Sequence, residues 1–237
     1  MPTTMTTLID CHVHTAQGSS DSSLRVEEMV PLAQGHNLGV NLTEHNRTWE
    51  PFRLEALRQA SGLFLVRGME VTTDMGHIVV IGLDQYYSGI RSARRLREVC
   101  DEKGAFMIVA HPFRHLLERR PGASEERFAM LPDEAAETMT VFQYVDGIEV
   151  GNGGTARAEN AFAYHVARLL GKPMVGGSDA HSVNGFASYT TGFTEDLTSE
   201  SDLLAALRSN SSTCVENVHL GEAREFTPAE EEALPRA

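Results

Sequence analysis

The chain has 237 residues, of which 41% are hydrophobic and 22% charged, and its formal net charge at pH 7 is -13. This length and apolar content suffice for one α/β barrel or two small domains. The acidic balance argues against nucleic acid polymers and anionic membranes as bulk electrostatic partners. No apolar run approaches the roughly 18 residues that a membrane span needs.

The N-terminus and the cysteines indicate the compartment. Residues 1–7 lack the basic and apolar regions of a secretory signal peptide. The three cysteines, Cys11, Cys100 and Cys214, are far apart and form no C-x-x-C motif. Such sparse cysteines are typical of free thiols in a reducing compartment, so we expect a cytoplasmic protein.

Short apolar segments alternate with amphipathic ones along the chain. We expect strands near residues 8–13, 40–43, 63–71, 78–83, 106–110, 147–150 and 174–177, the last strand of the fold. We expect helices near residues 26–34, 51–60, 90–103, 155–170 and 200–208, another up to about 136, and a short helix or frayed tail at the C-terminus. Nearly continuous apolar strands are typical of parallel strands buried on both faces. The pattern predicts a closed or distorted α/β barrel.

The predicted domain organisation is simple, because the sequence contains no internal repeat and no linker. We expect one domain over residues 1–237, with a barrel at about 8–215 and a C-terminal tail at about 216–237.

The first predicted strand carries Asp10, His12 and His14 at alternate positions. Alternate side chains of a strand lie on the same face, so these three share one face while Cys11 and Val13 share the other. Two histidines at this spacing have Cα atoms roughly 6–7 Å apart, close enough to bind one ion from the same side. The spacing indicates a metal site.

Further histidines and carboxylates occur at the edges of the later strands. They are His45, Glu70, His77, His111, Glu149, Asp179 and His181. Catalytic groups of parallel α/β barrels lie at the C-terminal ends of the strands, so we expect these side chains on one rim. Imidazoles with a few carboxylates suit zinc, manganese or iron better than magnesium or calcium. One ion cannot use so many donors, and we therefore expect two or three divalent ions close together.

These segments resemble the motif series of the PHP (polymerase and histidinol phosphatase) family. The matching segments, in the order of the family, are LIDCHVHT, TEHN, GME, GH, AHP, GIEV and SDAH, within residues 8–181. The resemblance implies an α/β fold that is a distorted (β/α)7 TIM-like barrel. It also implies a trinuclear metal site, at the C-terminal ends of the strands, that hydrolyses phosphoesters.

Carried over by position, the resemblance implies three sets of metal ligands. The first is His12, His14, Glu70 and Asp179, the second is His45, His181 and Asp21 of the serine-rich loop, and the third is His77, His111 and again Glu70. Glu70 would then be shared between ions.

Three other acids are expected to act near the ions without binding them. Glu149 would orient a ligand or a water, and Asp10 would do similar work or brace its strand. Glu44 stands where the family more often has aspartate, and its longer side chain would have to reach its partner differently.

The residues after His111 are basic. Arg114 is our candidate for binding a phosphate oxygen, whereas Arg119 and Arg120 fit a solvated basic loop slightly better.

The expected function is a metal-dependent phosphoesterase (a hydrolase) acting on a small phosphorylated metabolite. The substrate would be a phosphomonoester such as a nucleotide, a sugar phosphate or histidinol phosphate. A hydroxide bridging the ions would attack phosphorus, with Asp179, His181 and Arg114 as the catalytic group, and His181 or a metal-bound water would assist the leaving alkoxide.

Two alternatives remain open. One is a non-catalytic, metal-stabilised PHP binding module. The other is an amidohydrolase-type metal hydrolase, whose barrel also opens with His-x-His but commonly has a modified lysine between two ions. Neither Lys103 nor Lys172 is placed for that role in the sequence.

Overall fold

A computed structural model of the chain describes residues 5–116 and 130–233. Its strands are β1 (Thr7–Val13), β2 (Gly39–Leu42), β3 (Leu65–Thr73), β4 (Gly76–Ile81), β5 (Phe106–Val109), β6 (Gly147–Asn152), β7 (Met174–Gly177), β8 (Tyr189–Phe193), β9 (Thr213–Glu216) and β10 (Arg224–Glu225). Its α-helices are α1 (Val26–Gly35), α2 (Pro51–Ser61), α3 (Ala93–Lys103), α4 (Pro132–Thr138), α5 (Arg157–Leu170) and α6 (Glu200–Arg208). Three short 3-10 helices are η1 (Thr140–Gln143), η2 (Val218–Leu220) and η3 (Glu230–Ala233).

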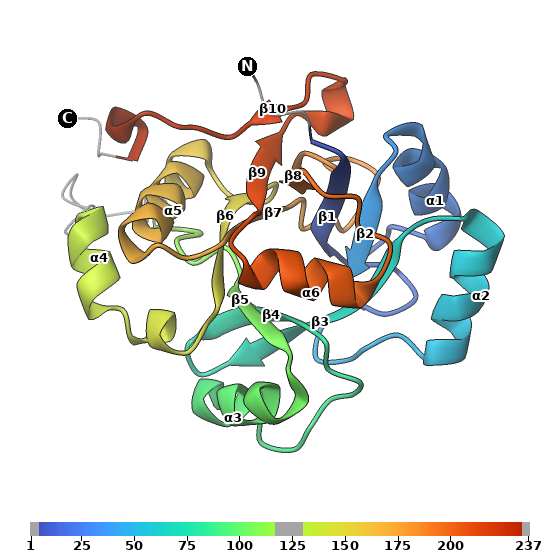
Figure 1. Cartoon of the computed structure of the whole chain (residues 1–237), viewed down its shortest axis with the longest axis horizontal. Coiled ribbons are helices and arrows are strands. Elements are labelled where there is room, and N and C mark those ends of the chain that lie inside the picture. Colours follow the sequence, from blue (N-terminus) through green and yellow to red (C-terminus); the bar gives the residue numbers. More distant parts are fainter. Residues whose placement is uncertain (1–4, 117–129, 234–237) are drawn as a thin grey trace.

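The strands form one curled mixed sheet in the order β10-β9-β8-β1-β2-β3-β4-β5-β6-β7. The pairs β1–β2, β2–β3, β5–β6 and β6–β7 are parallel, and the other pairs are antiparallel. In Figure 1, helices α1 and α2 lie to the right of the curled sheet, beside β1 and β2, and α4 and α5 lie to its left, beside β6. The α/β class is confirmed, but the mixed half-barrel does not confirm the distorted (β/α)7 barrel that we expected.

The sheet is not a regular barrel because β8 occupies one edge of β1. Thr7 to Ile9 of β1 pair antiparallel with β8. The end of β1 is instead bridged to the segment after β7, by the isolated parallel bridge between Val13 and Ala180. Strand β7 also lies close to β8. Gly176 permits this approach, because a Cβ there would lie 2.3 Å from the carbonyl oxygen of Thr190. The expectation that residues 174–177 form the last strand is wrong, since β8, β9 and β10 follow.

The strand expected at residues 78–83 is present as β4, but its antiparallel direction was not predicted. Only two residues separate Thr73 from Gly76, so β3 and β4 form a tight hairpin with no crossover helix. Gly76 has a φ of 102°, which favours glycine. Because β4 runs backwards, its first residues lie beside the end of β3, and His77 pairs with Thr72 there.

The helices expected at 26–34, 51–60, 90–103, 155–170 and 200–208 are present, with small shifts at their ends. Of the helix expected up to about residue 136, the structure describes α4 (Pro132–Thr138), and residues 117–129 lie outside the described residues. The hydroxyl of Ser199 accepts a hydrogen bond from the amide of Asp202, which caps the start of α6. Helix α3 begins at Ala93, later than expected, because the carboxylate of Asp74 accepts the amide hydrogen of Ala93 at 2.8 Å. In the described part of the chain, no helix is both long and apolar enough to span a membrane.

The three cysteines are free and buried. Burial raises the pKa of Cys11 and of Cys100 to about 12, and that of Cys214 well above its usual value. Since the thiolate is the reactive form, we expect no alkylation of the native protein at pH 8 and three alkylated cysteines after denaturation. Mass spectrometry after iodoacetamide treatment checks this, and modification of the native protein would contradict the packing described.

Candidate metal centre

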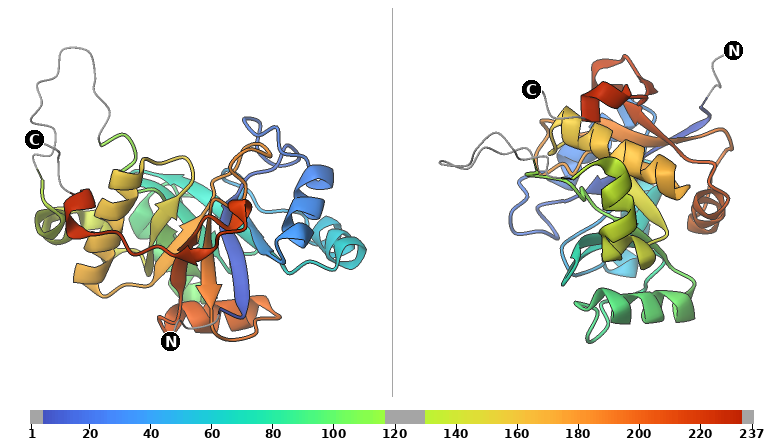
Figure 2. Two further views of the ribbon diagram at one scale, coloured as in Figure 1. Left: turned by 90° about the horizontal axis from the view of Figure 1, so that it is seen from above. Right: turned by 90° about the vertical axis from the view of Figure 1, so that its left-hand side faces the viewer.

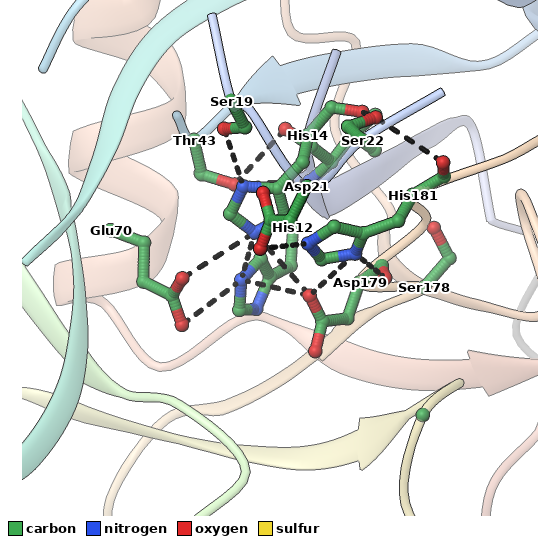
Figure 3. Close-up of polar contacts among 12 residues, drawn as sticks. His12, His14, Ser19, Asp21, Ser22, Thr43, Glu70, Ser178, Asp179 and His181 are labelled. Atoms are coloured by element: carbon green, nitrogen blue, oxygen red, sulfur yellow. Dashed lines mark hydrogen bonds and ion pairs between the residues drawn. The ribbon is translucent and has the colours of Figure 1, made fainter. Parts of the chain in front are cut away.

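Donor side chains from six strands converge on one rim of the sheet. In the left-hand view of Figure 2, β1 rises from the N-terminal end, and the loop after it reaches the far rim. Figure 3 shows the imidazoles of His12, His14 and His181 close to the carboxylates of Asp21, Glu70 and Asp179. Residues that are more than 160 positions apart in sequence, such as His12 and His181, therefore share one site.

Glu70, which is buried within β3 three residues before the end of the strand, is the common partner of this cluster. Its carboxylate oxygens lie 2.7–3.5 Å from ring nitrogens of five histidines, namely His12, His14, His45, His77 and His111. The isolated bridge between His45 and Glu70 fixes the ends of β2 and β3 side by side. The antiparallel β4 supplies His77 from the opposite direction.

Three groups within the described residues bring their donor atoms within 4.8 Å of one another. They are His12, His14 and Glu70; His14, His45 and His181; and Glu70, His77 and His111. These groups closely resemble the three ligand sets expected from the sequence, with His14 also near the second. The assignment of individual ligands stays a prediction.

The two aspartates expected as ligands lie at the edges of these groups. Oδ1 of Asp179 lies 3.5 Å from Nε2 of His12 and 3.3 Å from Nε2 of His14. Oδ2 of Asp21 lies 3.0 Å from Nε2 of His45 and 3.5 Å from Nε2 of His181. Asp179 is in the left-handed region with a φ of 53°, which turns its side chain towards the cluster. Both positions fit the predicted ligand sets.

Glu149 lies behind His12. Its Oε1 accepts a hydrogen bond from Nδ1 of His12 at 2.9 Å, and its Oε2 accepts the backbone amide of His111 at 2.7 Å. A carboxylate at Nδ1 places the proton there and leaves the lone pair of Nε2 facing the cluster. The geometry supports the predicted orienting role.

Glu44 performs the corresponding function for His14 through Ser19. The Ser19 hydroxyl donates to Glu44 Oε2 at 2.6 Å and lies 3.2 Å from Nδ1 of His14, from which it can accept. The indole of Trp49 donates to Glu44 Oε1 at 2.8 Å. Gly18 is required beside this acid, because a Cβ there would lie 2.2 Å from Cδ of Glu44. Glu44 therefore contacts His14 through Ser19, and its role towards an ion stays a prediction.

Asp10 supports the backbone. Its Oδ1 accepts the amides of Ser178 at 2.8 Å and His12 at 3.3 Å, and its Oδ2 accepts that of Ala187 at 3.1 Å. The side chain is fully buried, and burial raises the pKa of Asp10 to about 6 despite these hydrogen bonds. Asp10 thus braces β1 against the segment after β7.

Arg114 is held by protein groups. Its Nη2 pairs with Oδ2 of Asp179 and donates to Oδ1 of Asn152 at 2.6 Å, and its Nε donates to the hydroxyl of Thr155 at 3.2 Å. Its role in binding phosphate stays a prediction. Arg119 and Arg120 lie outside the described residues.

Three residues that the sequence did not single out complete the site: Ser19, Trp49 and Asn152. Asn152 is the last residue of β6, so the same strand-end argument that selected Glu149 would have found it. Ser19 and Trp49 are in loops, and no spacing rule connects them to Glu44.

The electrostatics of the cluster fit divalent cations. Burial opposes ionisation of Glu70, but the imidazoles of His12, His111 and His45 hold the pKa of Glu70 well below its usual range. Burial also disfavours a charged His12, yet Asp179, Glu149 and Glu70 together raise the pKa of His12 well above its usual value. In the metal-free protein, therefore, protons take the place that a cation would fill. The imidazole and carboxylate donors suit zinc, manganese or iron.

This arrangement predicts that metal binding releases protons. Hydrogen bonding to Glu70 also raises the pKa of His45. Both His12 and His45 must lose a proton before they bind an ion, so apparent affinity should rise with pH by about tenfold per unit for each proton displaced. The dependence should end above the raised pKa values. Calorimetric titration at several pH values, in two buffers of different ionisation enthalpy, measures the release; affinity independent of pH would contradict this account.

Comparison with known proteins finds one matching family model and several solved structures with a similar fold. A family model described as PHP-associated matches residues 157–212. A two-domain protein from Bacteroides vulgatus, which contains a predicted PHP-like metal-dependent phosphoesterase, is 20% identical with a TM-score of 0.56. The alignment covers 88% of this chain and 64% of that protein, so the chain spans less than two thirds of its length. The chain therefore resembles PHP proteins in its fold and in a PHP-associated segment near its C-terminus.

Two further solved structures share the fold of this chain. An amidohydrolase from Chromobacterium violaceum with bound sulfate is 20% identical, with a TM-score of 0.56 and coverage of 84% of this chain and 96% of that one. A lesion-specific endonuclease from Pyrococcus furiosus is 16% identical, with a TM-score of 0.53 and coverage of 86% and 56%. At these identities the likeness establishes the fold alone. No curated protein matches the chain.

Proposed function

We propose that this protein is a metal-dependent phosphoesterase that hydrolyses a phosphomonoester of a small metabolite. The observation that carries the proposal is the shared carboxylate of Glu70, within 3.5 Å of ring nitrogens from five histidines. One carboxylate among three donor groups is the arrangement expected of neighbouring divalent ions. A phosphoesterase domain among the structural neighbours supports this reaction class.

We assign two or three divalent ions, of zinc, manganese or iron, to the three ligand sets expected from the sequence. When bound, they would supply Lewis acidity and lower the pKa of water towards neutrality. Glu149 and Ser19 hold protons on Nδ1 of His12 and His14, which keeps both Nε2 atoms available as ligands. These residues prepare the site before substrate arrives.

The residues at the rim would bind and orient the phosphate. Arg114 is 22% exposed and lies beside Asp179, so its positive charge favours a phosphate dianion at this edge. Nδ1 of His181 donates to the carbonyl of Asp179 at 2.9 Å, which leaves Nε2 facing Asp21. We assign this nitrogen first as a ligand, with proton transfer to the leaving alkoxide as its second candidate role.

The proposed substrates are a nucleotide, a sugar phosphate or histidinol phosphate. The net charge of -13 disfavours a long polyanion as a bulk partner. Because one structural neighbour is an endonuclease, a DNA oligonucleotide belongs in the substrate panel. Free cysteines support the cytoplasm as the proposed location.

The decisive assay is hydrolysis of an aryl phosphate, followed by a panel of phosphorylated metabolites, with protein loaded with manganese or zinc. The variants Asp179→Ala and His111→Ala remove a donor from different groups and serve as controls. We expect turnover by the wild type that both variants lose. Equal inactivity of all three proteins across the panel would overturn the proposal, and tight metal binding without turnover would favour a binding module.

The positions of the lysines disfavour amidohydrolase chemistry, although one neighbour bears that name. Nζ of Lys172 donates to the carbonyl of Val145, and Nζ of Lys103 lies over the ring of Tyr87. Neither can lie between ions in this conformation.

A further inference from the structure

Asn152 is buried at the end of β6, between two of the acids at the metal rim. Its Nδ2 donates to Oε2 of Glu149 at 2.9 Å and lies 3.4 Å from Oδ2 of Asp179. Each of these acids has a second oxygen directed at the cluster: Oε1 of Glu149 accepts from His12, and Oδ1 of Asp179 lies 3.5 Å from Nε2 of His12. One amide therefore links the two carboxylates that flank His12.

The other end of the Asn152 amide holds Arg114. Its Oδ1 accepts hydrogen bonds from Nη2 of Arg114 at 2.6 Å, from the amide of Gly154 at 2.9 Å and from the hydroxyl of Thr155 at 3.1 Å. The same Nη2 pairs with Oδ2 of Asp179. Asn152 thus fixes Asp179 by two routes, directly and through the guanidinium.

The backbone of Asn152 is itself fixed by helix α5. Asn160 accepts the amide hydrogen of Asn152 at 3.2 Å and donates to its carbonyl at 3.0 Å. Both asparagines are buried. The position of the Asn152 side chain is therefore set by the packing of α5 on β6 and does not depend on a flexible loop.

The chemistry of the position suits asparagine. A carboxylate is only an acceptor, so two carboxylates need a donor between them, while Arg114 needs an acceptor. An amide supplies both at the two ends of one short side chain and adds no charge to a rim that already holds several acids.

We propose that Asn152 is a positioning residue, which sets the relative orientation of Glu149 and Asp179 and thereby prepares His12 and Asp179 to bind one of the ions. This inference rests on the proposed function. Loss of the Asn152 side chain should weaken mainly the binding of the ion held by the ligand set that includes His12, His14 and Asp179. Asn152 reaches the set of His77 and His111 only through the backbone of His111, which Glu149 holds.

The test is titration of the metal-free full chain with Co²⁺, following the visible absorption and the number of bound equivalents. For Asn152→Ala we expect one equivalent to bind about 10–100-fold more weakly with an altered spectrum, because the partners of metal ligands typically contribute this much to affinity. The remaining equivalents should bind nearly as in the wild type. Asn152→Ser, which can still donate and accept, should show a smaller effect at the same equivalent and serves if the alanine variant does not fold.

Ser199→Ala is the matched structural control. It removes the cap of α6, which should cost about 1 kcal/mol of stability, and no interaction described for Ser199 reaches the metal rim. We expect its melting temperature to fall while every equivalent binds as in the wild type.

The outcomes separate this inference from the proposed function. If the wild type binds cobalt and the Asn152 variants bind every equivalent unchanged, or lose all equivalents in proportion to their lowered melting temperature, Asn152 is not a positioning residue. If the wild type binds no divalent ion, the proposed function fails and this inference fails with it.

Discussion

Glu70→Gln should abolish hydrolysis and lower the bound metal by at least one ion per chain. The substitution preserves shape but removes the negative charge from the carboxylate that faces five imidazoles. An amide nitrogen would replace one oxygen, and that nitrogen cannot bind a cation. We expect activity to fall by more than about 100-fold, beyond the usual effect of a residue that only orients a ligand. Elemental analysis and steady-state kinetics measure the two effects.

Glu55→Gln is the matched control for this variant. Glu55 is exposed on α2, and its ion pair with Arg58 is a surface contact that contributes little to stability. The Glu55→Gln variant should retain the metal content and activity of the wild type. Normal metal content and turnover in Glu70→Gln would show that the carboxylate does not bind the ions.

Asp10→Ala should destabilise the metal-free protein by about 3 kcal/mol. The substitution leaves three buried backbone amides, those of His12, Ser178 and Ala187, without their acceptor. Each unsatisfied buried donor costs about 1–3 kcal/mol, and the relief of a buried charge offsets part of the total. Urea unfolding in the presence of a chelator measures the loss.

The pH dependence of the free energy of unfolding distinguishes the loss of the Asp10 carboxyl from the simple creation of a cavity. Because burial raises the pKa of Asp10 from 3.8 to about 6, the folded protein binds its proton more tightly than the unfolded chain. The contribution of this group is therefore most favourable below pH 4 and declines as pH rises through 6. The stability of the wild type relative to Asp10→Asn should decline over the same range. A difference that is constant with pH, or an alanine variant as stable as the wild type, would contradict the bracing role.

The sequence predicted which donor side chains lie together better than it predicted the strand topology. His12, His45, Glu70, His111 and Asp179 could be found because each lies at or next to the end of a strand expected from the sequence, and parallel strands bring these ends to one rim. Nearly continuous apolar runs identify such strands locally. It carries no information on strand direction, however, and the hairpin that reverses β4 depends on a two-residue turn.

His77 lies at the expected rim although the direction of β4 was not predicted. As the first residues of an antiparallel strand lie at the same rim as the last residues of its neighbours, His77 reaches Glu70 although its strand runs backwards. The antiparallel pairing of β8 with β1 had the larger effect, because it replaces the regular closure of a barrel. That pairing joins residues 182 to 186 positions apart, and nothing local in the sequence specifies it.

The residues that orient the ligands were harder to predict. The role of Glu44 depends on the hydroxyl of Ser19 and the indole of Trp49, which only the folded loops bring together. Arg114 was selected for its distance along the chain from His111, and the structure adds its pairing with Asp179 and Asn152. A single domain over the whole chain stays a prediction.

The most direct test of the metal centre is anomalous diffraction from crystals of the protein loaded with manganese or zinc. We predict two or three peaks around the Glu70 carboxylate, each about 2.0–2.3 Å from imidazole nitrogens or carboxylate oxygens of the three ligand sets. Peaks confined to surface acids, with the rim histidines making no bond to an ion, would contradict the account.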